Sequence, residues 1–316
     1  MGKVKKVQIL LILAAIGAGL VAIAEIGLRL LFGFGNPPLY IADEKIGYLL
    51  APKQKLRRMG NYIEVNEYSM RSAEVDTKRP QNNLRLLLLG DSVANGGWWT
   101  DQKNTISALI REQLTSVNQK QEIEVLNASA NSWGPRNQLA YLQRFGTFES
   151  QVLILLLNTD DLFAIAPTSL PVGRDRNYPS QKPSLALIEV YNRYLTYGQP
   201  IPGMAELQKE GGDRVGFNLE AITKVKSISD EKSASFILAM TPLLRELGEP
   251  GPKDYEIKAR ARLKEFTQSQ NIEYIDFLPL FNQAESPNSL YRDHIHLSVL
   301  GNQLVSEVIS ETIEKN

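Results

Sequence analysis

The chain has 316 residues, of which 43% are hydrophobic, so it is long enough to bury a sizeable core in one or two domains. Its 35 basic and 35 acidic residues balance, which removes the overall positive field that favours nucleic acid, and we expect no nucleic-acid partner. The absence of cysteine excludes disulfides, thiolate metal sites and a cysteine nucleophile.

The first 35 residues differ in composition from the rest of the chain. Three lysines within the first six residues precede an apolar run from Ile9 to Ala24, a pattern that predicts a transmembrane helix or a signal peptide. The segment Ala22-Ile23-Ala24 has the form of a cleavage site, but the hydrophobic pattern continues beyond it, which favours an uncleaved anchor. The positive-inside rule then keeps the lysines in the cytoplasm and places the rest of the chain outside it, in the periplasm or at the cell surface.

Residues 36–83 mix polar and apolar side chains without a long helical period. The sequence Asn36-Pro37-Pro38 marks the exit from the apolar segment, and a polar stretch near residue 80 closes the region. We expect short extended segments here, leading into a main domain that covers residues 84–316.

Short apolar runs alternate with helical patterns from residue 84 onward. The runs at 86–89, 123–126, 152–157, 235–240 and 272–276 predict strands, and the patterns near 104–117, 136–146, 184–197, 218–232, 254–269 and 298–314 predict helices. This alternation predicts an α/β fold with a parallel five-stranded sheet and helices on both faces. Active sites of such sheets lie beyond the carboxyl ends of the strands.

The first predicted strand ends in Gly90-Asp91-Ser92, which places Ser92 where the chain turns from strand to helix. A serine at this edge of the sheet is exposed to substrate and is a candidate nucleophile. The tripeptide by itself also fits an ordinary turn in which Asp91 or Ser92 caps a helix.

The only two histidines lie in Asp293-His294-Ile295-His296, just before the last predicted helix. An aspartate three residues before a histidine can accept the Nδ1 proton of His296 and leave Nε2 free to take a proton from a serine. Helix capping is the alternative role for Asp293 and His296, and a solvent-facing turn residue is the alternative for His294. A metal site on the two histidines would need carboxylates to complete it, and we expect no metal and no cofactor.

These two blocks, Gly90-Asp91-Ser92 and Asp293-x-x-His296, resemble the first and last motifs of the SGNH (GDSL) hydrolases. The resemblance covers residues 84–314 and implies a three-layer α/β/α sandwich, similar to flavodoxin, with Ser92, Asp293 and His296 as a catalytic triad.

The resemblance also implies an oxyanion hole built from the Ser92 N–H, a glycine N–H after the second strand and an asparagine side chain after the third. Both later positions depart from the family pattern. Ser132 stands at the glycine position with Gly134 two residues on, while Asp160 stands at the asparagine position with Asn158 two residues before it. An ionised Asp160 would repel an oxyanion unless burial raised its pKa, so Asn158 is the alternative donor.

Other residues fit the resemblance without being diagnostic. An anchor ending in Glu25-x-x-x-Arg29 is similar to that of membrane-anchored members. Arg71 is a candidate to reach the edge of the active site, and an exposed, solvated arginine is its alternative role. Trp98, Trp99 and Trp133 are candidates either for a wall around the site or for core packing.

Three functions agree with this sequence. The favoured one is a serine esterase that acts on an ester-bearing substrate, with an acylated carbohydrate as one candidate. The same triad would serve an O-acyltransferase acting on an exported polysaccharide, and the departures at Ser132 and Asp160 keep a catalytically inactive carbohydrate-binding member as the third. The retained Ser92, Asp293 and His296 argue against the last.

Overall fold

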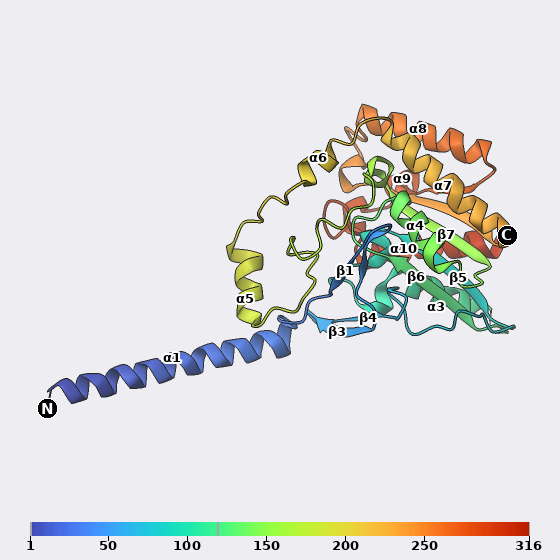
Figure 1. Cartoon of the computed structure of the whole chain (residues 1–316). Coiled ribbons are helices and arrows are strands. Elements are labelled where there is room, and N and C mark those ends of the chain that lie inside the picture. Colours follow the sequence, from blue (N-terminus) through green and yellow to red (C-terminus); the bar gives the residue numbers. More distant parts are fainter. Residues whose placement is uncertain (1, 119, 316) are drawn as a thin grey trace.

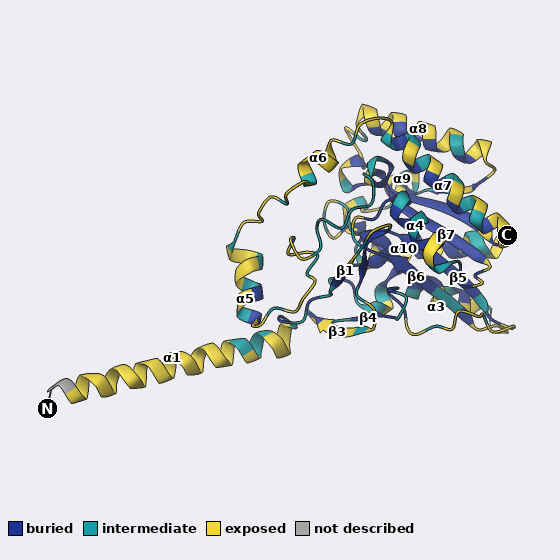
Figure 2. Cartoon of the chain, viewed as in Figure 1, coloured by how far each residue is buried: buried dark blue, intermediate teal, exposed yellow. Residues whose placement is uncertain are grey.

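The computed structural model describes residues 2–118 and 120–315. A long helix, α1 (Gly2–Phe32), projects from an α/β domain, and its side chains are exposed along most of its length (Figures 1 and 2). The extended segments expected between residues 36 and 83 pair into two antiparallel hairpins, β1 (Tyr40–Asp43) with β2 (Gly47–Leu50) and β3 (Gln54–Arg58) with β4 (Asn61–Val65). The hairpins lie between α1 and the central sheet in Figure 1.

The five predicted strands are present and form one parallel sheet in the order β6-β5-β7-β8-β9. They are β5 (Leu84–Gly90), β6 (Ile123–Ser129), β7 (Val152–Asn158), β8 (Ser235–Thr241) and β9 (Glu273–Asp276). The chain places β6 on one side of β5 and β7 on the other, so the strand order reverses at β5. A crevice forms at the carboxyl end of the strand where the order reverses, and Ser92 lies just beyond that end.

Helices cover both faces of the sheet and give the predicted three layers. On one face lie α3 (Ile106–Val117), α9 (Phe277–Gln283) and α10 (Val299–Lys315), and on the other lie α4 (Pro135–Phe145), α7 (Arg214–Glu231) and α8 (Asp254–Ser269). Successive leucines of β5 point to opposite faces: Leu86 and Leu88 pack in the first layer, Leu87 and Leu89 in the second. The unbroken apolar run of this strand is therefore explained by burial on both sides.

The long connection between β7 and α7 contains the main difference from the predicted elements. The helix expected near 184–197 is present as α5 (Ala186–Val190) and a π-helical turn (Tyr191–Leu195) that continues it directly. A short helix, α6 (Met204–Gln208), follows, and α7 begins four residues before its expected start because Asp213 caps it. The remaining short helices are α2 (Ser92–Asn95) and the 3₁₀ turns Gln102–Asn104, Thr159–Phe163, Leu244–Glu246 and Pro287–Leu290.

Candidate active site

Ser92 begins α2 directly after β5, at the carboxyl edge of the sheet. Asp91 caps this helix, because its carboxylate accepts a hydrogen bond from the Val93 N–H at 2.8 Å. Only glycine fits at position 90, since a Cβ there would lie 2.9 Å from the carbonyl oxygen of Leu156. The Ser92 N–H lies in the first turn of the helix and so has no acceptor within it.

The His296 ring stands between Ser92 and Asp293. Its Nε2 lies 3.0 Å from Ser92 Oγ, and its Nδ1 lies 3.0 and 2.9 Å from the two carboxylate oxygens of Asp293. Asp293 Oδ1 also accepts the backbone N–H groups of Ile295 at 3.1 Å and His296 at 2.9 Å, which fixes the carboxylate. The structure thus brings together three predicted residues from opposite ends of the domain.

The surroundings of Asp293 favour its ionised form. Partial burial works to raise the pKa of Asp293, but the hydrogen bonds from His296 and Ile295 outweigh it and the net shift is downward. We therefore assign the Nδ1 proton of His296 to the hydrogen bond with this carboxylate. The lone pair of Nε2 then faces the Ser92 hydroxyl, which is the arrangement of a general base beside a nucleophile.

Two of the three tryptophans lie beside this group. The Trp99 ring packs against the His296 ring with centroids 4.4 Å apart, and the Arg292 guanidinium lies 5.0 Å from the Trp99 centroid and 5.7 Å from that of Trp98. Trp133 is fully buried and donates from Nε1 to the Tyr48 carbonyl at 3.0 Å. Of the two roles considered for the tryptophans, the wall of the site fits Trp99 and core packing fits Trp133.

Arg71 lies beneath the loop that follows Ser92 rather than at the edge of the site. Its buried guanidinium donates to the carbonyls of Asn95 (2.8 Å), Gly97 and Thr100. Burial lowers the pKa of Arg71 to about 10, so the group remains charged at neutral pH. Its contacts hold the loop behind the nucleophile in place.

The backbone N–H groups of Ser132 and Gly134, two of the expected oxyanion positions, differ in whether they already have a hydrogen-bond acceptor. Gly134 already donates its N–H to Asn137 Oδ1 at 3.0 Å, as part of the start of α4. Ser132 has a left-handed backbone with φ of 58°, and among the described residues its N–H has no acceptor. Its Oγ accepts a hydrogen bond from the Tyr178 hydroxyl at 2.8 Å. The Ser132 N–H therefore remains free for a substrate, whereas the Ser92 N–H has no acceptor within α2 and lies beside the Asp91 carboxylate.

The side chains of Asn158 and Asp160 face different surroundings. The Asn158 amide donates to Asp91 Oδ2 at 2.7 Å and to Asp161 Oδ2 at 3.3 Å, and its Oδ1 accepts the Asp160 N–H at 2.8 Å. Asp160 is exposed, yet its pKa is raised, because partial removal of its carboxyl group from water outweighs the opposing charge of nearby Arg245. Asn158 is thus engaged beneath the nucleophile turn, and Asp160 lies on the rim.

The carboxyl groups of Asp91 and Asp161 form a buried pair joined by the Asn158 amide. Burial raises the pKa of both carboxyl groups, and the charge of Asp91 raises the pKa of Asp161 further. This pair was not predicted from the sequence. The available signal was an acidic residue within three positions of the end of each of two apolar strands, β5 and β7, which are neighbours in the sheet.

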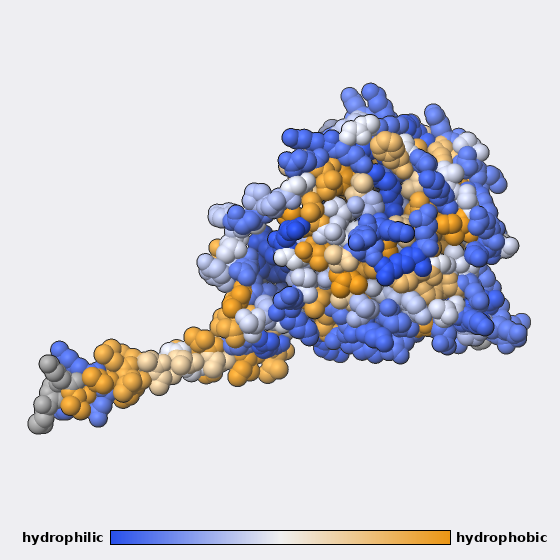
Figure 3. All heavy atoms as spheres, in the orientation of Figure 1, coloured by the Kyte–Doolittle hydropathy of each residue, from blue (hydrophilic) through white to orange (hydrophobic). Residues whose placement is uncertain are grey.

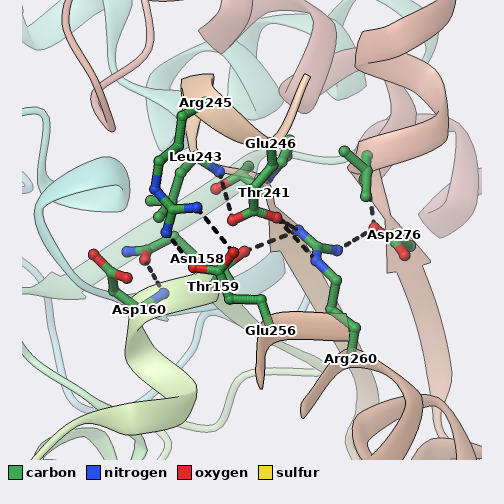
Figure 4. Close-up of polar contacts among 12 residues, drawn as sticks. Asn158, Thr159, Asp160, Thr241, Leu243, Arg245, Glu246, Glu256, Arg260 and Asp276 are labelled. Carbon is green, nitrogen blue, oxygen red and sulfur yellow. Dashed lines mark hydrogen bonds and ion pairs between the residues drawn. The ribbon is translucent and has the colours of Figure 1, made fainter. Parts of the chain in front are cut away.

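A second polar cluster supports the loop that follows β7 (Figure 4). Arg260 of α8 donates to Thr159 Oγ1 at 2.9 Å, to Glu246 Oε2 at 2.7 Å and to Asp276 Oδ1 at 2.9 Å. These partners follow or end β7, β8 and β9, so one buried guanidinium joins three strand ends. The cluster fixes the position of Thr159, the residue that follows Asn158 in the chain. It was not predicted from the sequence, because its members are far apart in the chain.

A cavity of about 450 Å³ adjoins Ser92. One side is formed by residues of the site, including Ser132, Asn158 and Asp160, and the other by the connection between β7 and α7. That connection contributes polar Asp175 and Tyr178 together with apolar Ile201 and Met204.

His294 does not line this cavity. Its side chain is exposed and its Nδ1 lies 3.9 Å from Asp293 Oδ1. Among the residues that the structure describes, no group of three or more His, Asp or Glu side chains is arranged to hold a metal ion.

The GDSL-like lipase/acylhydrolase family model matches residues 88–304, a range that includes Ser92, Asp293 and His296. Similar solved structures include a putative acylhydrolase from Bacteroides fragilis, with 13% identity, a TM-score of 0.45, and coverage of 75% of this chain and 90% of the other. An acetylxylan esterase from Geobacillus stearothermophilus has 15% identity, a TM-score of 0.49, and coverage of 72% and 92%. A lipase/acylhydrolase from Enterococcus faecalis has 16% identity, a TM-score of 0.46, and coverage of 73% and 95%. No curated protein matches the chain.

Proposed function

We propose, because the chain belongs to the GDSL-like lipase/acylhydrolase family of ester-hydrolysing enzymes, that Ser92 is its nucleophile, His296 its general base and Asp293 the group that orients the base. The observation that carries this proposal is the continuous series of hydrogen bonds from Ser92 Oγ through the His296 ring to the Asp293 carboxylate. The same three residues argue against an inactive binding protein, which would not need them in this arrangement.

The first half of the reaction forms an acyl-enzyme. His296 Nε2 takes the proton of the Ser92 hydroxyl as Oγ attacks the ester carbonyl carbon. The negative charge that develops on the carbonyl oxygen is met by the N–H groups of Ser92 and Ser132, two residues that line the cavity. The C–O bond to the alcohol then breaks, and the imidazolium returns its proton to the departing alcohol.

The second half regenerates the enzyme. Water attacks the acyl carbon while His296 removes its proton, and the bond to Ser92 Oγ breaks as the serine is reprotonated. Throughout, Asp293 remains ionised and stabilises the imidazolium, as its lowered pKa favours.

The cavity lining supports an acylated carbohydrate as the substrate. Asp175, Tyr178 and Asp160 offer hydrogen-bonding groups for sugar hydroxyls, while Ile201 and Met204 offer an apolar surface for the acyl group.

We also propose that α1 is an uncleaved membrane anchor and that the catalytic domain is extracytoplasmic. Among the described residues one helix, over Val4–Phe32, is long and apolar enough to cross a membrane, and the span is not buried against the domain. A signal sequence would pass the same test. N-terminal sequencing of the protein purified from membranes distinguishes the two, since a mature chain that begins at Glu25 would overturn the anchor.

The experiment that tests the chemistry is labelling with a serine-directed phosphonate, combined with hydrolysis of p-nitrophenyl acetate. Wild type is expected to be labelled once and to turn over the ester, whereas Ser92→Ala should lose both. Ser227→Ala is the matched control, because it removes an exposed serine hydroxyl on α7 that lies outside the cavity. Labelling that persists in Ser92→Ala would refute the nucleophile.

A further inference from the structure

The connection between β7 and α7 exposes an apolar surface next to the end of α1. In this surface, which covers residues 185–197, the exposed side chains are Leu185, Ile188, Tyr191, Tyr194, Leu195 and Tyr197. The exposed fractions reach 71% for Leu195 and 94% for Tyr197, and six large exposed side chains of this kind within 13 residues form a patch rather than isolated exposed residues. Figure 3 shows hydrophobic surface continuing from α1 onto the adjoining part of the domain.

Hydrogen bonds fix this segment to α1. The Glu25 carboxylate accepts the N–H groups of Ala186 at 2.8 Å and Leu187 at 3.0 Å, at the start of α5. Arg29 donates to the Ser184 carbonyl at 3.0 Å and pairs with Glu25 at 2.6 Å. Figure 1 shows α5 beside the domain end of α1.

A buried ion pair holds the other side of the segment. Glu189 accepts the Gly35 N–H at 2.6 Å and pairs with Arg58 of β3 at 2.5 Å. The Phe34 ring lies edge-on to Tyr194, with centroids 6.2 Å apart. The segment is therefore held between the end of α1 and the first hairpins, and its position relative to the anchor is set.

The position of Glu25 along α1 gives the depth of this segment in a bilayer. About 20 helical residues cross the hydrocarbon layer, so a span that begins after Lys6 ends near Ile26. Glu25 lies in the last turn of that span, at the boundary between hydrocarbon and headgroups. Ala186 and Leu187, which are bonded to Glu25, must lie near the same level.

We propose that residues 185–197 form a second membrane contact, which rests in the interfacial layer of the bilayer beside the anchor. The inference rests on the proposed anchoring of α1. Its chemistry is that of an interfacial belt, in which tyrosine rings lie at headgroup level while leucine and isoleucine reach the outer hydrocarbon. Residues 201–208 of the same connection line the cavity next to Ser92, so the contact holds that cavity close to the membrane surface.

The absence of cysteine makes a direct depth measurement possible in the full-length chain. Single variants Leu195→Cys and Tyr197→Cys are labelled with an environment-sensitive fluorophore and reconstituted into phosphatidylcholine vesicles containing doxyl-labelled lipids. Ile16→Cys reports on the anchor itself. Ile257→Cys, on α8 and 52% exposed, is the matched control for an exposed apolar residue far from α1.

We expect the probes at 195 and 197 to shift their emission to shorter wavelength and to lose most of their fluorescence to the doxyl lipids, with no loss at 257. Loss at 16 without loss at 195 and 197 would overturn the membrane contact while leaving the anchor intact. No loss at any of these positions would overturn the anchoring and the inference together. A blue shift at 195 and 197 without lipid quenching would show that a protein covers this surface, which also refutes the proposal.

Discussion

Replacing Asp293 by asparagine tests the assigned proton positions at the site. The asparagine side chain would keep nearly the same shape, and its Oδ1 could still accept the N–H groups of Ile295 and His296. Its NH₂ group would then face His296 Nδ1, which must become the acceptor. The proton moves to Nε2, and the nitrogen that faces Ser92 Oγ at 3.0 Å loses the lone pair that takes the serine proton.

The expected cost of Asp293→Asn is large, because the base is present but in the wrong tautomer. The same change in a Ser-His-Asp triad lowers kcat by about 10⁴-fold, which corresponds to roughly 5 kcal/mol of transition-state stabilisation. The assay is kcat for p-nitrophenyl acetate at neutral pH, with the urea midpoint to show that the variant is folded. His294→Ala is the matched control, since that exposed histidine makes no hydrogen bond to the site, and it should retain wild-type activity. If Asp293→Asn kept more than about a tenth of the wild-type kcat, the assigned roles of Asp293 and His296 would be wrong.

The other predictions concern the donors and the buried acids. Asp160→Asn should change kcat by far less than the roughly 100-fold that one oxyanion donor supplies, because its side chain lies on the rim; a large gain would place position 160 in the hole. Ser132→Gly should retain activity, since glycine adopts a φ of 58° freely, whereas Ser132→Val should displace the N–H and lower kcat by about 100-fold. Equal kcat values for these two folded variants would exclude this donor. The raised pKa of Asp161 means that the native state binds more protons than the unfolded state above about pH 4, so the free energy of unfolding should fall as pH rises through that window. Asp161→Asn should flatten this slope in urea unfolding measured from pH 4 to 8, and an unchanged slope would locate the proton elsewhere.

The parallel sheet and the helices on both of its faces could be predicted from the sequence, because both depend on the alternation of short apolar runs with helical patterns. The apolar runs at 86–89 and 152–157 are fully buried strands. Because both faces of these strands are buried, the runs contain no polar residue and are easy to recognise in the sequence. The predicted family is confirmed by the family model over residues 88–304. The proximity of Ser92 to His296 followed from this fold, since both were expected at the carboxyl edge of one sheet.

The partners of individual polar side chains were not accessible from sequence. Arg71 was a candidate for the edge of the site, but its guanidinium is buried among three backbone carbonyls of the loop that follows Ser92. The direction of so long a side chain depends on the conformation of the surrounding loop, which the sequence does not give. Arg260 contacts Glu246, Asp276 and Thr159, and no spacing in the chain links these four positions. The helix expected over 184–197 is present from Ala186 to Leu195, but its change to π-helical geometry at Tyr191 was not predicted.

The engagement of Asn158 explains how the site can differ from its family at position 160. An asparagine that donates to both Asp91 and Asp161 stabilises the turn on which Ser92 sits and cannot also turn toward a substrate. Polar groups beneath the nucleophile therefore bond to one another, and the proposed oxyanion donors are backbone N–H groups. Donors of that kind depend on the conformation of the turns at Ser92 and Ser132 rather than on side-chain identity. An aspartate at position 160 is then tolerable as long as it stays on the solvent side of the loop that Arg260 supports through Thr159.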